Sequence, residues 1–332
     1  MIDAYLNWPK QIRDAIETWG KYFVEGSFNE IVVVGMGGSG IVGDYLQVLH
    51  SASGGIPVYT IKSHVLPRFI DENTLILIIS YSGNTVETLA ALKQALNTKG
   101  RIVTVSSGGY LRDESSKLGL THISIPSGLP PRASLPSMLY SILGLLDSSG
   151  YGVYSREDAS RSLLFLEVSI KKAKSIAEDV SKWLYKHVVS DERLFIIATH
   201  SPLEPLAVRG KNEFNENSKL IAKVDVAPEW MHNDIVGYEH PVPRKFCVLE
   251  IVDPSDAIGN KLVDFMEKIY LQYDTKLYKF TLDGNNTLEK LMYGSLILGL
   301  SSSMLAEIRG LNPVETKNIT LYKHEASKIF TL

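Results

Sequence analysis

Short runs of consecutive apolar residues recur along both halves of the chain, and each leads through a polar turn into a segment with helical spacing. The clearest run, residues 75–79, contains no polar side chain, which predicts a strand buried on both faces of a parallel sheet. Further strands are expected at residues 31–34, 57–61, 101–105, 122–125, 194–198, 220–224, 246–252 and 276–280. Strands that alternate with helices predict an α/β fold in which helices cover both faces of each sheet.

The helical segments complete this pattern and indicate where the chain divides. They are expected at residues 8–23, 85–97, 136–147, 157–186, 202–219, 256–273 and 288–308, with a short piece after residue 110. The glycine- and serine-rich stretch 148–154 is the best candidate linker, so the predicted domains are residues 1–152 and 153–332. The apolar stretch 292–305 contains three serines at 301–303, which favours a buried helix over a membrane span.

Composition restricts the class of protein. With 332 residues, 45% hydrophobic and 21% charged, the chain is typical of a soluble globular protein with two domains. A net charge of −3 gives no general attraction to nucleic acid or to an anionic membrane. The single cysteine, Cys247, excludes an internal disulfide, and its apolar neighbours predict a buried, unreactive thiol. The N-terminus lacks the basic and then apolar pattern of a signal peptide, so the expected location is the cytoplasm.

A turn rich in hydroxyl groups follows the strand at 75–79. Ser80, Ser82, Gly83, Asn84 and Thr85 lie within six positions. Asn84 or Thr85 is a suitable N-cap for the next helix, whose first N–H groups would point outward beside these hydroxyls. Such a turn predicts a site for an anion, most simply a phosphate. The alternative is an ordinary strand–turn–helix junction whose hydroxyls only cap the helix.

A glycine-rich turn, Gly35-Met-Gly-Gly-Ser-Gly40, follows the strand at 31–34. It has the spacing G-x-G-x-x-G of dinucleotide-binding folds, in which an acidic residue after the second strand holds the ribose. Here the second strand is followed by a lysine, a serine and a histidine at 62–64, which disfavours an NAD-dependent enzyme. The simpler interpretation is a second turn at a helix N-terminus, with Ser39 directed at the same ligand as the turn at 80–85.

Arg132 lies in a proline-rich stretch, residues 127–136, just before an expected helix. The positive end of the helix dipole disfavours a cation at this place. A neighbouring anion, either a ligand or a carboxylate, would explain the arginine. The alternative is an arginine exposed to solvent.

Two polar stretches of the second half could carry acid–base chemistry, and the first contains Glu216. If the helix expected at 202–219 keeps its apolar side toward the core, Glu216 lies on the opposite side, away from the core. Glu216 is then either a solvated residue with Lys219 three positions later, or a carboxylate presented to a cleft or a partner subunit. The second case requires Asn215 and Asn217 to interrupt the helix.

The second polar stretch contains His232 between Trp230, Met231 and Asn233. This histidine is either a core residue whose ring is satisfied by neighbours, or a proton shuttle whose tautomer a neighbour fixes. The eight histidines of the chain show no spacing typical of metal ligands, so no metal is expected.

Taken together, these segments resemble the SIS (sugar isomerase) superfamily and, within it, the bifunctional phosphoglucose/phosphomannose isomerases. The resemblance covers essentially the whole chain. Its motifs are Gly35-Met-Gly-Gly-Ser-Gly40, Ser80-Tyr-Ser-Gly-Asn-Thr85, Pro130-Pro-Arg-Ala133, Asn215-Glu-Asn-Ser-Lys219 and His232-Asn233. The first two mark the superfamily, and the last three together are specific to the isomerase branch.

The resemblance implies two SIS domains, each with a mainly parallel five-stranded sheet between helices. It also implies an active site at a homodimer interface, with the histidine supplied by the partner subunit. The implied activity is an aldose–ketose isomerisation that interconverts fructose 6-phosphate with glucose 6-phosphate and mannose 6-phosphate, without a cofactor or metal. The alternative is a non-catalytic SIS protein that binds a sugar phosphate as a regulatory signal.

The same resemblance implies a role for each motif residue. Glu216 would be the base that moves a proton between C2 and C1, Arg132 would steady the enediolate, and His232 would assist ring opening. The residues that would bind the sugar phosphate are Gly37, Gly38, Ser39, Ser80, Ser82 and Thr85.

Two residues near the C-terminus also enter the site by resemblance. Thr316 would leave room for rotation about the C2–C3 bond, so that both sugars are accepted. Lys323, seven positions later, matches the lysine of the family best, and Lys317 and Lys328 are alternatives for it.

Overall fold

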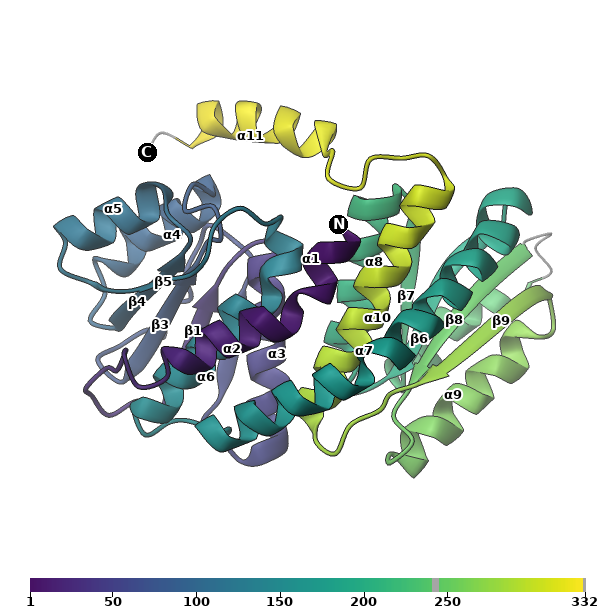
Figure 1. Cartoon of the computed structure of the whole chain (residues 1–332), viewed down its shortest axis with the longest axis horizontal. Coiled ribbons are helices and arrows are strands. Elements are labelled where there is room, and N and C mark those ends of the chain that lie inside the picture. The colour runs from purple at the N-terminus through teal and green to yellow at the C-terminus, as the bar shows by residue number, and fades with distance from the viewer. Residues whose placement is uncertain (241–244, 331–332) are drawn as a thin grey trace. The chain divides into compact units, whose positions relative to one another are not determined.

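The computed structural model describes residues 1–240 and 245–330, which form two compact units (Figure 1). The first unit comprises Leu6–Leu164 and the described residues from Thr316 onward, and the second unit comprises Met1–Tyr5 and Phe165–Glu315. The chain therefore passes between the units three times. One passage lies inside the long helix α7 (Arg156–Leu184). The predicted domain boundary after residue 152 lies just before this helix and stays a prediction.

The sheet of the first unit has five parallel strands in the order β2-β1-β3-β4-β5. They are β1 (Glu30–Val34), β2 (Val58–Ile61), β3 (Thr74–Ile79), β4 (Arg101–Ser106) and β5 (Thr121–Ser124). Val33 of β1 lies in register between Thr60 of β2 and Leu77 of β3. Every residue of β3 is buried, as its uninterrupted apolar pattern predicts. The five strands predicted for this half are confirmed.

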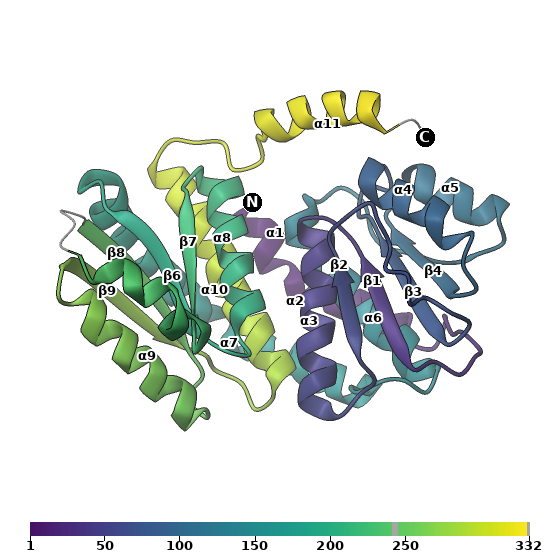
Figure 2. The ribbon, with the colours of Figure 1, turned by 180° about the vertical axis from the view of Figure 1, so that it is seen from behind.

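Helices cover both faces of the first sheet (Figure 2). They are α2 (Trp8–Glu17), α3 (Gly38–Ser53), α4 (Val86–Ala95), α5 (Gly109–Lys117) and α6 (Leu135–Ser148). One face packs on α4 and α5 through a core that includes Ile76, Leu92 and Leu111. On the other face α3 lies so close that a side chain at Gly43 would meet those of β1 and β2. α6 packs against α2 and α3.

The sheet of the second unit has four parallel strands among the described residues, in the order β7-β6-β8-β9. They are β6 (Leu194–His200), β7 (Ala222–Ala227), β8 (Lys245–Val252) and β9 (Asp274–Thr281). The expectation of five strands in this unit is therefore wrong. The residue pattern itself predicts four strands in this half, and each of them overlaps an observed strand.

Helices also cover both faces of the second sheet (Figure 1). The remaining helices of the chain are α1 (Ile2–Leu6), α8 (Glu204–Ser218), α9 (Ala257–Tyr270), α10 (Thr287–Ile308) and, in the first unit, α11 (Lys317–Ile329). One face of the sheet packs on α9 through Ile196, Val248 and Met266. On the other face a side chain at Gly210 of α8 would meet Ile197 of β6 and α10.

Several predicted helices end a few residues earlier than expected, among them those predicted at 85–97 and 256–273, which end at Ala95 and Tyr270. The helix predicted at 8–23 ends at Glu17. The chain then turns through Gly20, whose φ of +86° a helix cannot contain. The helix predicted at 157–186 ends at Leu184 and continues as a π-helical segment, Tyr185–Ser190.

α10 is the one described helix that is long and apolar enough to cross a membrane. Of its apolar stretch, 89% is buried inside the structure, and the helix packs along α8. The prediction of a buried core helix is confirmed. Cys247 of β8 is also buried, and burial raises the pKa of its thiol, in agreement with an unreactive residue.

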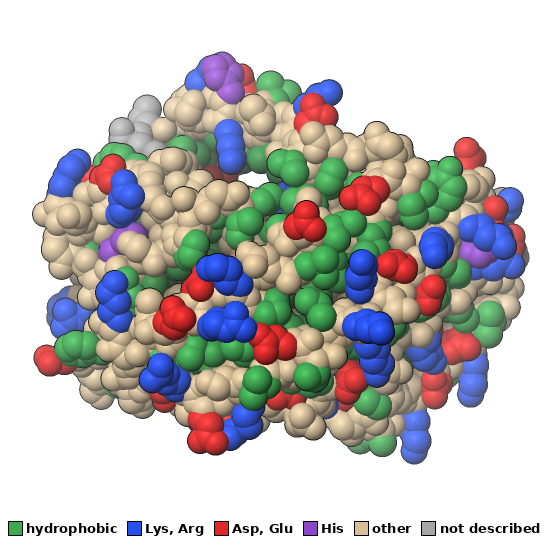
Figure 3. All heavy atoms as spheres, in the orientation of Figure 1, with side chains coloured by type: hydrophobic (Ala, Val, Ile, Leu, Met, Phe, Trp, Pro, Cys, Tyr) green, Lys and Arg blue, Asp and Glu red, His purple; other side chains and the backbone are tan. Residues whose placement is uncertain are grey.

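Charged side chains of both signs are mixed on the face of the molecule seen in Figure 3. Lysine and arginine form no continuous patch among the described residues of that face. This mixture agrees with the small net charge of −3.

Candidate functional site

The hydroxyl-rich turn of the first unit connects β3 to α4. Thr85 is the N-cap residue of α4, and its side chain makes no cap hydrogen bond among the described residues. Ser80 Oγ donates to Thr85 Oγ1 (3.0 Å) and accepts from the Thr85 N–H (3.4 Å). Ser82 Oγ accepts from the Asn84 N–H at 3.3 Å. The hydroxyls therefore fold the turn itself, and the predicted cap position at Thr85 is confirmed.

Gly83 fixes the path of this turn. Its φ is +69°, and a Cβ atom there would lie 1.8 Å from the carbonyl oxygen of Gly108, in the loop after β4. Only glycine fits such a position. In addition, Asn84 Oδ1 accepts from the Tyr110 N–H at 2.9 Å. The loops after β3 and β4 therefore support each other at the carboxyl edge of the sheet.

The glycine-rich turn lies beside this turn. α3 begins directly after Gly37, its N-cap residue, which is exposed. Ser39 Oγ in the first turn of α3 accepts from the Tyr81 N–H at 3.2 Å. The two turns therefore adjoin, and the prediction that Ser39 is directed at the same ligand as the turn at 80–85 stays a prediction. Lys62 forms an ion pair with Asp44 of α3, so a basic residue stands where dinucleotide folds place an acid.

Arg132 lies in the 3₁₀ turn Pro131–Ser134, directly before α6. It is only 5% exposed, which overturns the interpretation as an arginine open to solvent. A Cβ atom on Gly38 would lie 3.1 Å from the backbone nitrogen of Arg132. The fold therefore places Arg132 directly against the start of α3.

The predicted phosphate-binding residues are not equally accessible. Ser39 and Ser80 are 4% and 1% exposed, and their hydroxyls bond within the protein. Ser82 and Thr85 are half-buried, and Gly37 is exposed. Ser82, Thr85 and the N-terminus of α3 can therefore meet a ligand, while the two buried serines support them from behind.

The C-terminal helix α11 carries the last predicted site residues. Thr316 is its N-cap residue, and Lys323 lies about two turns later with its side chain exposed. The Tyr322 hydroxyl donates to a Glu87 carboxylate oxygen in the first turn of α4. α11 is therefore attached to the first unit beside the hydroxyl-rich turn.

Glu216 lies in the last turn of α8, in the second unit. The helix continues through Asn215 and Asn217 and ends where Lys219 adopts a left-handed conformation with φ +54°. The prediction that the two asparagines interrupt the helix is wrong, because Asn217 turns inward, is fully buried and bonds within the core. Glu216 itself is half-buried, and Lys219 Nζ donates to its backbone carbonyl at 2.6 Å.

The inner side of α8 carries a buried polar network that the sequence analysis missed. Glu213 accepts hydrogen bonds from the Tyr5 hydroxyl, from Arg209 (2.5 Å) and from Asn217 (3.0 Å). Asn217 also donates to Ser302 of α10 at 2.9 Å. None of these five residues is more than 1% exposed. The signal in the sequence was the four-residue spacing of Arg209, Glu213 and Asn217, which places them on one side of a helix.

His232 ends the 3₁₀ turn Glu229–His232, which follows β7. Trp230 in the same turn is buried against the rings of Tyr238 and Tyr270, whereas His232 is exposed. The interpretation as a core histidine is wrong, because the turn buries its tryptophan and directs the histidine outward. An exposed imidazole can exchange protons with a ligand or with another chain.

The helices after β8 and β9 begin differently from those of the first sheet. Asp256 caps α9 by accepting two N–H groups of its first turn at 3.1 and 2.8 Å, and Asn286 caps α10 by accepting one at 3.0 Å. Lys290 of α10 forms an ion pair with Asp253 at 2.8 Å. Side chains of the protein therefore occupy the positions at which an anion could bind.

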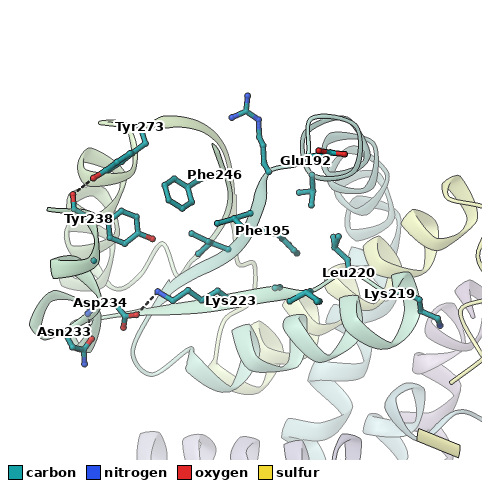
Figure 4. A pocket seen from close by; sticks show the side chains of 17 residues that line it. Glu192, Phe195, Lys219, Leu220, Lys223, Asn233, Asp234, Tyr238, Phe246 and Tyr273 are labelled. Atoms are coloured by element: carbon teal, nitrogen blue, oxygen red, sulfur yellow. Dashed lines mark hydrogen bonds and ion pairs between the residues drawn. The ribbon is translucent and has the colours of Figure 1, made fainter. Parts of the chain in front are cut away.

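A cavity of about 1130 Å³ lies in the second unit, beside the amino ends of β6, β7 and β8 (Figure 4). At its rim Lys223 donates to Asp234 at 2.6 Å, and the ring of Tyr238 forms part of the wall. Ligands of parallel sheets bind at the carboxyl ends of strands, and neither Glu216 nor His232 is among the lining residues. We therefore do not assign this cavity to the candidate site.

Burial changes the proton affinity of several groups in the second unit. Burial, and then the neighbouring Glu213, raises the pKa of the Tyr5 phenol. Burial raises the pKa of the Glu250 carboxyl in β8 to about 7, although Lys279 lies 3.2 Å away and opposes the shift. Within residues 1–240 and 245–330, no three His, Cys, Asp or Glu side chains are grouped so that they could hold a metal ion.

Comparison with known proteins gives the family. The model of the SIS domain matches residues 27–113, and the model of the bacterial phospho-glucose isomerase C-terminal SIS domain matches residues 171–325. A bifunctional phosphoglucose/phosphomannose isomerase from Aeropyrum pernix is 34% identical over 97% of both chains. This chain belongs to that isomerase family. It is an isomerase, as its motifs predict.

Two further similarities show how widely the fold is used. A D-glucosamine-6-phosphate 4-epimerase from Sulfolobus acidocaldarius is 29% identical to this isomerase, over 96% of this chain and 95% of that protein. The crystal structure of a hypothetical protein from Thermus thermophilus has a TM-score of 0.76 at 16% identity, and the match covers 99% of this chain and 91% of that one. The similarity to the Thermus thermophilus structure shows the shared fold. The similarity to the epimerase shows that a related sequence can have another named activity, so the reaction of this chain has to be measured directly.

The predicted site residues of this isomerase are divided between the two units. The first unit holds both turns, Arg132, Thr316 and Lys323, and the second holds Glu216 and His232. The elements that carry them are regular helices and tight turns supported by buried contacts.

Proposed function

We propose that this isomerase interconverts fructose 6-phosphate with glucose 6-phosphate and mannose 6-phosphate through an enediolate, with Glu216 as the base. The observation that carries the proposal is the pair of adjoining turns at the carboxyl edge of the first sheet, joined by the hydrogen bond from Tyr81 to Ser39. The named reaction of the 34% identical relative supports the same conclusion.

The two turns suit a phosphate monoester. α3 and α4 both begin there, and helix N-termini present N–H groups and the positive ends of their dipoles. Ser82 and Thr85 add hydroxyl donors at the accessible side of the turn. Arg132, whose backbone lies against Gly38, would meet the negative charge that develops on the sugar oxygens.

Glu216 would perform the proton transfer. Starting from the aldose, the carboxylate takes the proton from C2, a C1–C2 double bond forms, and the electrons of the C1 carbonyl move to O1. The hydroxyl proton on O2 passes to O1, Glu216 returns its proton to C1, and the carbonyl re-forms at C2. The reaction balances without an oxidant or reductant. Glucose 6-phosphate and mannose 6-phosphate give the same enediol, and Thr316 would leave room for the rotation that exchanges them.

Ring opening needs a further proton transfer, from the O1 hydroxyl to the ring oxygen. We assign it to His232, acting in a homodimer as the partner subunit's His232, with Lys323 near the sugar. The exposed position of His232 on a turn anchored by the buried Trp230 supports this assignment. We place the enzyme in the cytoplasm, where its proposed substrates are metabolised.

The test is turnover of fructose 6-phosphate by the purified chain, in D₂O and with and without EDTA. Glucose 6-phosphate and mannose 6-phosphate are assayed separately. We expect both products, no effect of EDTA, and deuterium at C2 in part of each product, because the proton held on Glu216 exchanges with solvent before it is returned.

Other outcomes would select other functions. Binding of fructose 6-phosphate without turnover would favour the regulatory SIS protein. Glucose 6-phosphate alone would keep the isomerase but remove the role of Thr316. Products without deuterium at C2, together with saturable NAD(P) binding, would contradict the enediolate path.

A further inference from the structure

We infer that residues 5–11 form a positioning element of the isomerase, which holds both the helix end that carries Glu216 and the turn that carries Arg132. The inference rests on the proposed function, because it assumes that Glu216 and Arg132 act on the substrate. Two independent sets of contacts support it, one in each unit.

The first set is centred on Tyr5, in the second unit. Its hydroxyl donates to Glu213 and accepts from Asn217 Nδ2 at 3.2 Å. Glu213 lies three residues before Glu216 on α8, and Asn217 lies directly after it. Tyr5 therefore contacts the residues on both sides of the candidate base.

The packing around Tyr5 is as specific as its hydrogen bonds. A Cβ atom on Gly299 of α10 would lie 2.3 Å from Tyr5 Cε1, so this glycine makes room for the ring. Three residues later on α10, Ser302 accepts from Asn217. The phenol is therefore wedged between α8 and α10, and it is 0% exposed.

Stability does not explain why this network is polar. A buried ion pair such as Arg209–Glu213 usually contributes little net stability, and apolar side chains of similar volume are often as good or better. Its position one turn from Glu216 is the feature that distinguishes it. The hydrogen bonds of Glu213 and Asn217 hold the last turn of α8, and with it the backbone from which the Glu216 side chain extends.

The second set of contacts involves Trp8 and Gln11, in the first unit. Trp8 Nε1 and Gln11 Nε2 both donate to the carbonyl oxygen of Ala133 at 2.9 Å. Gln11 Oε1 also accepts from the Ser137 hydroxyl at 2.9 Å. Ala133 follows Arg132 in the 3₁₀ turn, so these bonds fix the peptide next to the arginine.

The two sets are joined by a very short piece of chain. Tyr5 and Trp8 are three residues apart, and the chain passes from the second unit to the first directly after Tyr5. This segment is a covalent connection between the residue that supports the base and the residues that support the arginine.

The first test compares Tyr5→Phe with Tyr270→Phe. Both phenols are 0% exposed in the second unit and donate to a carboxylate, Glu213 in one case and Asp225 (2.7 Å) in the other. Only Tyr5 contacts the turn of Glu216. Since a displacement of about 1 Å can cost on the order of 100-fold in rate, we expect kcat of Tyr5→Phe to fall about 10- to 100-fold with KM within twofold. Tyr270→Phe should lose about as much stability as Tyr5→Phe, but its kcat should equal that of the unmodified enzyme.

The second test compares Trp8→Phe with Trp19→Phe. Trp19 Nε1 donates to Asp147 at 2.8 Å in the same unit, away from Arg132. We expect Trp8→Phe to lower kcat about tenfold, and Trp19→Phe to leave it within twofold. Ser302→Ala provides a mild variant of the first set if Tyr5→Phe does not fold, and its kcat should fall about threefold.

The outcomes separate this inference from the proposed function. Equal kcat values for Tyr5→Phe and Tyr270→Phe, with Glu216→Gln inactive, would overturn the positioning role and leave the base in place. An active Glu216→Gln would overturn the proposed base first. A loss of stability in Tyr5→Phe without any change in kcat would show that the network is only structural.

Discussion

At the carboxyl end of the first sheet, α3 and α4 begin at Gly37 and Thr85 without a side-chain cap hydrogen bond among the described residues. At the same end of the second sheet, α9 and α10 are capped by Asp256 and Asn286. α8 also begins without a side-chain cap, but Pro205 and Glu204 stand in its first turn. The first sheet therefore leaves the N-termini of α3 and α4 without a capping side chain, whereas the second sheet caps those of α9 and α10 with its own side chains.

The two sheets also differ in what they bury. The central strand β3 of the first sheet is fully buried and apolar apart from Thr74. The second sheet buries two carboxylates, Asp225 in β7 and Glu250 in β8, each 0% exposed and each paired with a lysine at the margin. The comparison teaches that a shared fold does not distribute polar groups equally, and that a phosphate site is expected where helix ends are left unpaired.

The largest effect is expected for Gly83→Ala, which should destroy the uncapped turn of the first sheet. The left-handed φ and the 1.8 Å approach to Gly108 together should cost about 3 to 5 kcal/mol of unfolding free energy. Gly119→Ala is the matched control, since Gly119 has φ +65° but nothing within 4 Å of the added Cβ. It should cost about 1 kcal/mol. The measurement is urea unfolding of both variants. Equal losses of unfolding free energy would show that the short distance between residue 83 and Gly108 does not matter for stability.

The next effect concerns the buried acid of the second sheet. The pKa of Glu250 is about 7 in the folded chain, against an ordinary value of 4.5. Between these pH values the unfolded chain binds fewer protons, so the free energy of unfolding should fall as pH rises, by about 3 kcal/mol in total. Glu250→Gln should remove this decline. The measurement is urea unfolding at several pH values from 4.5 to 8.

A matched control exists for that variant. Glu267 also pairs with Lys279 at 3.0 Å but is not fully buried. Glu267→Gln should leave the pH dependence in place. If both variants flatten it equally, the effect comes from the lysine and not from burial of Glu250.

A smaller effect is expected for the ligand hydroxyls of the first sheet. Ser82→Ala and Thr85→Val each remove a donor to a phosphate, and a hydrogen bond to a charged group contributes about 1.5 kcal/mol or more. Each should raise KM for fructose 6-phosphate about tenfold and leave kcat within twofold. Ser116→Ala, at an exposed position of α5, is the control. Unchanged KM values would place the phosphate elsewhere.

The smallest effect is expected for Asp256→Ala, which uncaps α9 in the second sheet. Loss of an N-cap costs about 1 kcal/mol, so the midpoint of urea unfolding should shift slightly. KM should stay within twofold, because this helix end is not used for the substrate. A tenfold change in KM would show that the two sheets share the ligand after all.

Local patterns were enough to predict most of the fold. All nine described strands overlap strands predicted from the sequence, and the turns at Ser39 and Thr85 were placed correctly at helix starts. Short-range rules succeed there because each signal is contained in a few consecutive residues. The prediction of five strands in the second sheet was wrong because the fifth strand was inferred from the resemblance and not from the residue pattern.

Contacts distant in sequence could not be predicted. The burial of Arg132 depends on α3 approaching its turn, and the buried network joins Tyr5 to Glu213 across 208 positions. The inward turn of Asn217 is of the same kind, since its partner Ser302 lies on another helix. The roles of Glu216, His232, Thr316 and Lys323 stay predictions that the resemblance supplies.

The most direct test of the central claim is the turnover of fructose 6-phosphate by Glu216→Gln beside Glu204→Gln. Both residues lie on α8, and Glu204 is exposed in its first turn. A positioned general base contributes about 10²- to 10⁴-fold. We predict that Glu216→Gln loses at least 100-fold in kcat while it folds and binds substrate normally, and that Glu204→Gln matches the unmodified enzyme. If Glu216→Gln keeps more than a tenth of the activity, Glu216 is not the base and the proposed mechanism is wrong.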